Sequence, residues 1–476
     1  MPQTAVTLKW VFDKKRDESG QVVRYKARLC ARGFTQRYGR DYTETFAPVV
    51  GLTVFRAIVA IATRRGFQLF HADVTSAYLH AELKEEIYVE KPEGMIVPEG
   101  CAVKLKRAIY GLKQSGRVWQ QVLVEWLLQH GFERVACDGC VYTSARTSVS
   151  VGIIIGVYVD DICGTAPSQK VWTGFIVSLS EAFPIKEGQL KMYLGIVVQR
   201  TKDATLLHQE SFIRRMLDSF GMSQSKPVPV PADAQRLSAW ENNDEPANEK
   251  EFRRAVGMLQ WIASATRPDI KWAVQQVSRY MSKPAKRHWT AVKRVMRYLC
   301  GTIKFGVVYR LSAEHPELHA FVDSDFAGDI DTRKSTYGYV IYLSGGPIGW
   351  GSKLQGIVAR SSAEAEYCGI ADAGKEIVHV RQLLVELGII SMEYQVPVIN
   401  DSQSAIAICR ETGPSKRTKH VAIRFHWIKE EVQNGHICLK WQPTQSMIAD
   451  ILTKPLGKQV FERLRVHVVE DGTSFG

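Results

Sequence analysis

The residues of this chain best suited to chemistry are two adjacent aspartates, Asp160 and Asp161. They come at the end of residues 151–159, a run that is almost continuously apolar and rich in Val and Ile. Such a run predicts a strand buried on both faces. Two carboxylates at the end of a buried strand are costly to desolvate unless a cation offsets their charge. We therefore expect a divalent metal ion at this position.

A third aspartate, Asp73, is placed in a similar way. It lies in residues 67–74, a short apolar run that ends near this carboxylate. If the two strands lie side by side, Asp73, Asp160 and Asp161 form one cluster. Carboxylate oxygens suit Mg²⁺, and two such ions about 3.5–4 Å apart support in-line phosphoryl transfer. An aspartate pair alone is more often a turn or a helix cap, so the flanking segments decide between these interpretations.

The flanking segments resemble the polyprotein of copia-type retrotransposons. The matching segments are YKARLCARGFTQ at 25–36, ETFAPV at 44–49, YGLKQ at 110–114, YVDD at 158–161, TRPDI at 266–270 and ADILTKPL at 449–456. They extend from about Lys9 to Leu456, which is nearly the whole chain. The resemblance implies a reverse transcriptase followed by a ribonuclease H domain. Because the chain begins within the first polymerase strands, we expect it to be part of a longer gene product.

The chain of 476 residues is long enough for several domains. The resemblance implies a multidomain α+β and α/β protein, in which a right-hand polymerase fold of fingers, palm and thumb precedes a ribonuclease H-like domain. The expected ranges are 1–223 for fingers and palm, 224–315 for a linker and a helical thumb or connection, 316–456 for the ribonuclease H-like domain, and 457–476 for a C-terminal tail. Prolines at 227, 229 and 231 exclude a regular helix from the start of the linker, which is a connector or a long wrapping segment.

Apolar periodicity and turn residues predict the individual elements. We expect a hairpin over 10–31, strands over 101–113, 151–159, 192–198, 318–323, 337–343, 347–351, 396–400 and 436–441, and helices over 52–65, 118–129, 211–220, 251–265, 270–282, 286–300, 362–387, 402–410, 421–434 and 445–452. Strands followed by alternating strands and helices are typical of a ribonuclease H-like fold. The basic residues of helix 286–300 indicate either a solvated face or a contact with nucleic acid.

The resemblance implies roles for two sets of polymerase residues. The catalytic and metal-binding residues are Asp73, Asp160 and Asp161. The nucleotide-binding residues are Lys26, Arg28, Tyr78 and Gln114. Two Mg²⁺ ions, or Mn²⁺ in their place, are expected at the carboxylates. The ring of Tyr78 is expected under the incoming sugar, where it excludes a 2′-hydroxyl, and a core tyrosine is the alternative.

Four carboxylates recur at element ends in the C-terminal third, and they are Asp323, Glu366, Asp401 and Asp450. Their order resembles the metal site of ribonuclease H, which implies two further Mg²⁺ ions and cleavage of RNA in RNA–DNA hybrids. Glu364 competes with Glu366, but a spacing of two residues turns its side chain to another face of the helix. Asp325 is the weaker alternative to Asp323. The loop before Asp450 lacks the His that many ribonucleases H carry.

The charge balance favours a polyanionic partner. The net charge is +13, although charge alone does not separate nucleic acid from a membrane surface. The resemblance implies an RNA template, an RNA–DNA hybrid, a DNA primer and deoxynucleoside triphosphates as partners. Nine scattered cysteines indicate a reducing compartment. No secretory signal and no apolar run near 18 residues is present, so we expect a protein that is not secreted and has no membrane partner, located in the cytoplasm, in virus-like particles or in the nucleus.

The leading hypothesis is an RNA-directed and DNA-directed DNA polymerase with a ribonuclease H that cleaves hybrids. One alternative is a decayed or domesticated copy that only binds nucleic acid. Another is a hybrid nuclease with a structural polymerase half. The presence of every matched carboxylate argues against decay, and Tyr78 together with the polymerase aspartates argues against a purely structural first half.

Overall fold

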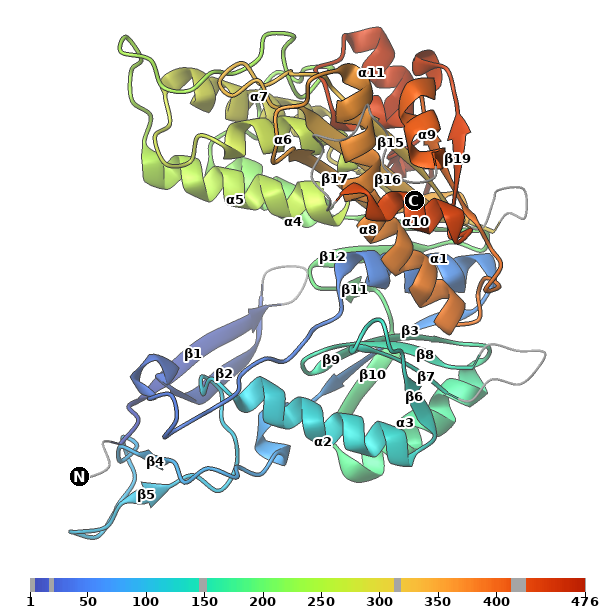
Figure 1. Cartoon of the computed structure of the whole chain (residues 1–476). Helices are drawn as coiled ribbons and strands as arrows, with labels where there is room; N and C mark the ends of the chain where they lie inside the picture. Colours follow the sequence, from blue (N-terminus) through green and yellow to red (C-terminus); the bar gives the residue numbers. More distant parts are fainter. Residues whose placement is uncertain (1–4, 17–20, 145–151, 312–317, 412–424, 476) are drawn as a thin grey trace. The chain divides into compact units, whose positions relative to one another are not determined.

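The computed structural model describes residues 5–16, 21–144, 152–311, 318–411 and 425–475 (Figure 1). The chain separates into two compact units, a first unit of Met1–Val50 with Phe70–Gly188 and a second unit of Gly51–Leu69 with Gln189–Gly476. These two compact units do not coincide with the four domain ranges expected from the sequence. The four ranges remain predictions about the functional domains. None of the described helices is long and apolar enough to cross a membrane.

The first unit is built on a six-stranded sheet with the order β10-β3-β9-β8-β7-β6. The strands are β3 (Gln68–Val74), β6 (Phe132–Arg134), β7 (Val141–Ser144), β8 (Ile154–Tyr158), β9 (Asp161–Ala166) and β10 (Ile185–Gln189). Helices α2 (Ser115–Gln129) and α3 (Gln169–Ala182) share one apolar cluster with this sheet. Trp119, Leu123 and Leu127 of α2 are buried at intervals of four residues, which gives the helix a single apolar face.

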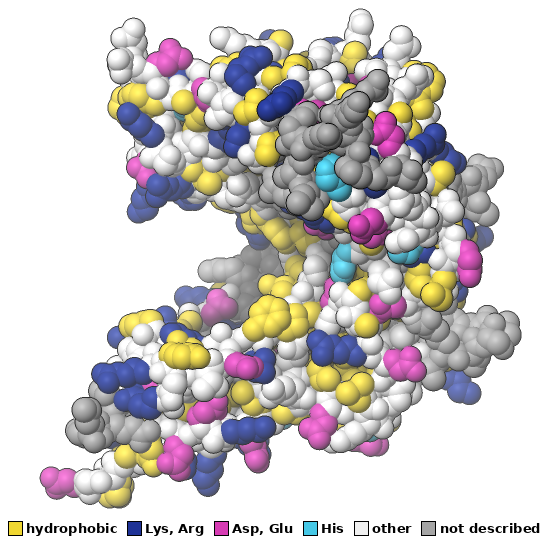
Figure 2. Space-filling model, viewed as in Figure 1, with side chains coloured by type: hydrophobic (Ala, Val, Ile, Leu, Met, Phe, Trp, Pro, Cys, Tyr) yellow, Lys and Arg dark blue, Asp and Glu magenta, His cyan; other side chains and the backbone are white. Residues whose placement is uncertain are grey.

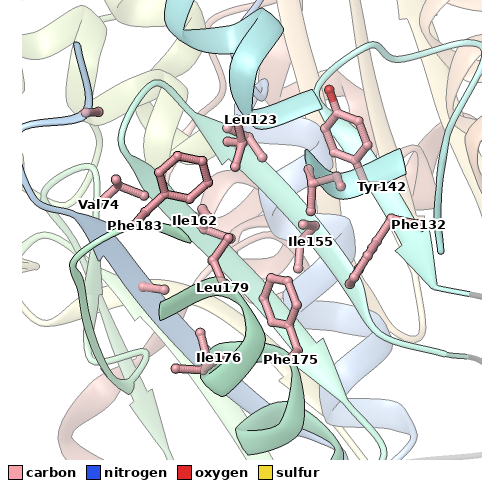
Figure 3. Packing of buried hydrophobic residues seen from close by; sticks show 14 of the residues in the cluster. Val74, Leu123, Phe132, Tyr142, Ile155, Ile162, Phe175, Ile176, Leu179 and Phe183 are labelled. Carbon is pink, nitrogen blue, oxygen red and sulfur yellow. The ribbon is translucent and has the colours of Figure 1, made fainter. Parts of the chain in front are cut away.

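Aromatic side chains fill the space between these helices and the sheet. Trp172 of α3 stacks on Phe70 of β3 with ring centroids 4.6 Å apart. Figure 3 shows Phe175 and Leu179 of α3 beside Ile155 of β8. Burial of side chains of this size is the main favourable contribution to the stability of the unit. The packing therefore holds β8 and β9, the two strands that flank the aspartate pair.

Two smaller pairs of strands complete the first unit. β1 (Leu8–Arg16) and β2 (Val22–Ala31) form the hairpin expected from the sequence. β4 (Tyr88–Val89) pairs with β5 (Val103–Lys104). The strand expected over 101–113 is wrong outside these two residues of β5. Its apolar residues, Leu112 among them, instead pack into a small separate cluster with Ile87, and they do not form a regular ladder.

The second unit contains two five-stranded sheets. One, with the order β11-β12-β13-β14-β20, consists of β11 (Met192–Tyr193), β12 (Ile196–Arg200), β13 (Ala204–His208), β14 (Phe305–Arg310) and β20 (Glu470–Asp471). The other, with the order β17-β16-β15-β18-β19, consists of β15 (Leu318–Ser324), β16 (Thr336–Leu343), β17 (Gly346–Leu354), β18 (Val396–Asn400) and β19 (Ile437–Trp441). β15, β18 and β19 are parallel neighbours, so their carboxyl ends lie at the same edge of the sheet.

The helices of the second unit are α1 (Leu52–Arg64), α4 (Glu210–Ser219), α5 (Glu249–Ala265), α6 (Lys271–Ser278), α7 (Lys286–Gly301), α8 (Ser362–Glu386), α9 (Gln403–Arg410), α10 (Trp427–Gln433) and α11 (Lys458–Arg465). The long α8 packs on β15 and β16. It begins after Ser361, whose side chain accepts a hydrogen bond from Glu364 N at 3.2 Å, as a helix N-cap does.

The strand expected over 192–198 is in fact a tight hairpin. β11 and β12 pair around Leu194 and Gly195, which take φ angles of +50° and +78°. Two successive residues with positive φ make the type of turn that matches the twist of a hairpin. Gly195 at the second position lowers the cost of that conformation. The turn was not expected because Leu194, at the first position, is not a residue type that indicates one.

The C-terminal region also differs from expectation. The helix expected over 445–452 consists of two 3₁₀ turns, η5 (Thr444–Ser446) and η6 (Ile448–Leu452). The helix expected over 421–434 begins at Trp427, and its first residues lie outside the described part of the chain. The range 457–476, expected to be a tail, contains α11 and β20. Buried residues of α11 and the pairing of β20 with β14 anchor it to the second unit.

The segment 226–248 runs along α7 with almost no regular structure. Arg287 of α7 donates to Asp244 Oδ2 at 2.7 Å. Arg294 of α7 pairs with Asp233 at 2.9 Å. The sequence left open whether these basic residues face solvent or nucleic acid. The structure gives these two arginines another role, which is to hold a wrapping segment of the same chain.

The TRPDI motif forms a buried ion pair. Arg267 and Asp269 lie 2.7 Å apart with neither side chain exposed, and Arg267 also donates to Thr302 O at 2.7 Å. Asp269→Ala leaves the guanidinium buried without its anion, so we expect the free energy of unfolding to fall by about 3–5 kcal/mol in denaturant titrations. Lys375→Ala, which removes an exposed pair with Asp372, should change it by less than about 1 kcal/mol. Equal losses in the two variants would contradict a stabilising role for the buried pair.

Candidate active sites

The aspartate pair lies at the turn of the hairpin formed by β8 and β9. Tyr158 pairs with Asp161 across this turn, and Val159 takes a φ angle of +59°. A β-branched residue in the left-handed region is strained. Trp119 of α2 donates its indole N–H to Val159 O at 2.8 Å. The buried helix thus holds in place the strained turn that presents Asp160.

Asp73 reaches this turn from β3. The expectation that its strand lies directly beside the strand of residues 151–159 is wrong, because β9 lies between β3 and β8. Asp73 still comes close to the turn, since the next residue, Val74, donates its N–H to Asp160 O at 2.9 Å. Asp161 Oδ1 lies 3.2 Å from His71 Nε2. In the described part of the chain, the three aspartates do not converge within 4.8 Å of one another.

The electrostatic surroundings of Asp160 favour a cation. Burial raises the pKa of Asp160, the negative charges of Asp161 and Asp73 raise it further, and Arg28 lowers it. Like charges in a poorly solvated place are stabilised by a bound positive ion. Because the donors are carboxylate oxygens, the residues fit the Mg²⁺ that the sequence predicts.

Two predicted nucleotide-binding residues lie beside these aspartates. Arg28 on β2 stands over the ring of Tyr110, 5.5 Å from its centroid. Tyr78, in the 3₁₀ helix η2 (Ala77–His80), packs edge-on against the same ring with centroids 4.7 Å apart. Burial and the charge of Asp160 raise the pKa of Tyr78. The half-buried Tyr78 is therefore both packed and adjacent to the candidate site.

The other two predicted nucleotide-binding residues differ from each other. Lys26 is half-buried and lies two residues before Arg28 on β2, which places both on the same face of the hairpin. Gln114 is only 1% exposed. Its Nε2 donates to Asp41 O at 2.8 Å, and its Oε1 accepts from Gln36 Nε2 at 3.0 Å. These contacts tie segments of the first unit together and engage both ends of the Gln114 amide within the protein.

Three of the four predicted nuclease carboxylates converge. Ligand atoms of Asp323, Glu366 and Asp401 all lie within 4.8 Å of one another, and no other such group occurs among the described residues. Asp323 is on β15 and Asp401 follows β18, so parallel pairing brings them to one edge of the sheet. Glu366 comes from α8, which approaches the sheet closely at Gly369. A Cβ at Gly369 would lie 2.1 Å from Ser324 Oγ.

The fourth predicted carboxylate, Asp450, meets this group through a lysine. Lys454 Nζ lies 2.7 Å from Asp450 Oδ1 and 3.7 Å from Asp323 Oδ2. Burial, with the charge of Asp323, raises the pKa of Asp450 to about 7. Burial and Asp323 also raise the pKa of Glu366 well above its ordinary value. A buried set of carboxylates in this state fits a hard divalent cation such as Mg²⁺.

The two competing acids are engaged elsewhere. Glu364 Oε2 accepts a backbone hydrogen bond at 2.8 Å at the start of α8. Asp325 Oδ2 accepts from Arg236 at 2.7 Å. Neither belongs to the converging group of described residues. The geometry favours Glu366 over Glu364, and it favours Asp323 over Asp325.

Besides Lys454 and Thr453, which contact Asp323, two more residues that the sequence did not single out bond these carboxylates. Asn400 Nδ2 donates to Glu366 Oε2 at 2.9 Å. Thr444 Oγ1 donates to Asp401 Oδ2 at 2.5 Å. Asn400 directly precedes Asp401 in the chain, so its neighbourhood was the available signal. Thr444 lies in the loop before Asp450, where many ribonucleases H carry a His, and its hydroxyl contacts Asp401 from that loop.

Comparisons with known proteins agree with these features. Residues 2–234 match the family described as Reverse transcriptase (RNA-dependent DNA polymerase). Over 465 residues, 95% of the chain, the sequence is 38% identical to the Retrovirus-related Pol polyprotein from transposon TNT 1-94 of Nicotiana tabacum, of which it covers 35%. It is 37% identical over 463 residues to the corresponding polyprotein from transposon RE2 of Arabidopsis thaliana, covering 96% of this chain and 31% of that relative. The chain thus spans about a third of the length of these relatives.

A solved structure supports the polymerase fold. The foamy viral protease-reverse transcriptase dRH, determined in complex with double-stranded DNA, is similar with a TM-score of 0.51 and 14% sequence identity. The similarity covers 93% of this chain and 67% of that chain. At this identity the likeness concerns the fold alone. Together with the sequence relatives, it leads to one conclusion: this chain contains the reverse transcriptase domain of a copia-type Pol polyprotein.

Proposed function

We propose that this chain is an RNA-directed and DNA-directed DNA polymerase of a copia-type retrotransposon, with a ribonuclease H that cleaves RNA in RNA–DNA hybrids. One observation carries the proposal: each compact unit has its own set of neighbouring carboxylates that act on one another electrostatically. The sets are Asp73, Asp160 and Asp161 in the first unit, and Asp323, Glu366, Asp401 and Asp450 in the second. Enzymes that make or break phosphodiester bonds bind paired divalent ions at such sets.

Mg²⁺, when bound, would supply activation of the attacking oxygen and neutralisation of the developing charge in both reactions, and Mn²⁺ would serve in its place. The other functions fall to the side chains. Arg28, whose charge acts on Asp160, is placed to bind an anionic triphosphate, with Lys26 on the same face of β2. Tyr78 would bound the space for the sugar of a deoxynucleoside triphosphate.

The hairpin of β1 and β2 offers a surface for the template. One face exposes Trp10, Phe12 and Tyr25. The rings of Trp10 and Phe12 stack with centroids 6.4 Å apart, and Lys14 lies 5.7 Å from the centroid of Tyr25. Aromatic rings next to cations are typical of surfaces that bind single-stranded nucleic acid. The many Lys and Arg side chains in Figure 2 and the DNA bound by the foamy viral protein support RNA and DNA as partners.

The proposed location is intracellular, in the cytoplasm, in virus-like particles or in the nucleus. The nine cysteines all lie in the described part of the chain, none of them is in a disulfide there, and several are buried. Free thiols persist in a reducing compartment, which supports this placement.

Primer extension on a homopolymer RNA template tests the polymerase, and a labelled RNA–DNA hybrid tests the nuclease. Both reactions should require Mg²⁺ and proceed with the purified chain. A protein that binds template and primer but extends nothing at any Mg²⁺ or Mn²⁺ concentration would instead be a decayed or domesticated copy. Extension without hybrid cleavage would restrict the function to the polymerase.

Tyr78→Ala is expected to admit ribonucleotides. Removing the ring opens space beside the 2′ carbon, and loss of a steric contact of this kind erodes discrimination by about 10- to 200-fold. The ratio of ribonucleotide to deoxynucleotide incorporation measures the effect. Tyr78→Phe keeps the ring and should keep the wild-type ratio. If Tyr78→Ala also keeps it, Tyr78 serves only to pack against Tyr110.

A further inference from the structure

Asn400 is a buried polar side chain that makes three hydrogen bonds beside the nuclease carboxylates. It is the last residue of β18 and is fully buried, with 0% of its surface exposed. Its Nδ2 donates to Val322 O and to Glu366 Oε2, both at 2.9 Å. Its Oδ1 accepts from Ser402 N at 2.9 Å. Every polar atom of this amide is therefore engaged within the protein.

Each of these bonds ends at or next to a different carboxylate of the converging group. Val322 directly precedes Asp323 on β15, so the first bond joins the end of β15 to the end of β18. Ser402 directly follows Asp401, so the bond to its N–H closes a turn around that aspartate. The remaining bond is made to Glu366 itself. One buried side chain thus links the three elements that supply the carboxylates.

An amide suits this position better than the alternatives. A carboxylate could not donate to Glu366 and would add a like charge beside it. An apolar side chain would leave Val322 O, Ser402 N and one oxygen of Glu366 without this partner, and unmade buried hydrogen bonds are costly. Buried networks in which every group is satisfied fix one arrangement of their members. Asn400 can therefore hold Glu366 in a single orientation.

We propose that Asn400 is a positioning residue of the nuclease site, which orients Glu366 and the turn of Asp401 so that the carboxylates bind Mg²⁺. The inference rests on the proposed nuclease function and names no contact with the hybrid. It assigns to Asn400 the role of a partner that hydrogen-bonds a metal ligand. Loss of such partners commonly weakens metal binding or activity by about 10- to 100-fold.

The test compares variants of the full chain in an Asp160→Asn background, so that the polymerase cluster contributes little to metal binding. Titration calorimetry with Mg²⁺ alone measures affinity without substrate, and hybrid cleavage gives the Mg²⁺ concentration for half-maximal rate. Asn400→Leu should weaken binding by about 10-fold or more and raise the Mg²⁺ midpoint to match. Asn400→Thr keeps one short hydroxyl donor on a strand-compatible side chain, so its Mg²⁺ affinity should fall between those of wild type and Asn400→Leu. This variant provides the test if Asn400→Leu does not fold.

Two reference variants separate the possible results. Val398→Ala removes buried apolar atoms from the same strand, and it should lower the melting temperature without moving the Mg²⁺ midpoint. Asp323→Asn should abolish both Mg²⁺ binding at this site and hybrid cleavage. Wild-type Mg²⁺ affinity in folded Asn400→Leu and Asn400→Thr, or an equal shift in Val398→Ala, would overturn the role of Asn400. Intact cleavage in Asp323→Asn would overturn the proposed nuclease itself.

Discussion

Asp160→Asn is expected to abolish primer extension and to leave cleavage of RNA–DNA hybrids unchanged. Asp160 is half-buried at the hairpin turn, and the negative charges of Asp73 and Asp161 both act on it. The substitution keeps the size of the side chain but removes one anion from the set that would hold the ions. Loss of a catalytic group commonly lowers the rate by more than about 1,000-fold. The hybrid should still be cut, because the second carboxylate set lies in a different compact unit.

Extension of a labelled primer and cleavage of a labelled hybrid would be measured on one preparation. Glu133→Gln is a matched control, since it removes an exposed carboxylate from β6 at the edge of the same sheet. This variant should extend primers at the wild-type rate. If Asp160→Asn lost both activities while its melting temperature stayed unchanged, a model with two independent sites would be wrong.

Glu366→Gln is expected to produce the opposite pattern, with hybrid cleavage lost and primer extension intact. Glu366 is one of the three carboxylates that converge within 4.8 Å. Two divalent ions held close together repel each other strongly, and several anionic ligands are needed to offset that repulsion. A neutral amide of the same shape at this position should therefore weaken metal binding sharply, and the rate should again fall by more than about 1,000-fold.

Glu364→Gln is the internal control for the register of α8. Glu364 accepts a backbone hydrogen bond at the start of the helix and lies outside the converging group. A hybrid assay over a series of Mg²⁺ concentrations should show nearly wild-type cleavage for this variant. If Glu364→Gln were the inactive one, the assignment of the helix face would be reversed. If both variants were active, α8 would supply no ligand.

Local structure could be read from the sequence where the signal was itself local. The strand expected over 396–400 has the bounds of β18, and the helix expected over 362–387 differs from α8 by one residue. Apolar periodicity and an N-cap such as Ser361 act within a few residues of each other, so they are visible without knowledge of the fold. The segment 192–198 was misread because Leu194 takes a positive φ angle, which its residue type does not announce.

The resemblance to copia-type polyproteins named the carboxylates, but only the tertiary structure decided how they are grouped and held. Val322 and Asn400 are 78 residues apart in the chain, and parallel pairing of β15 with β18 is what brings them together. The sequence by itself determined the order of the elements and the acids at their ends, because these depend on residue type and short spacing. Strand order, the burial of Asn400 and the convergence of Asp323, Glu366 and Asp401 depend on long-range packing, which no local pattern specifies.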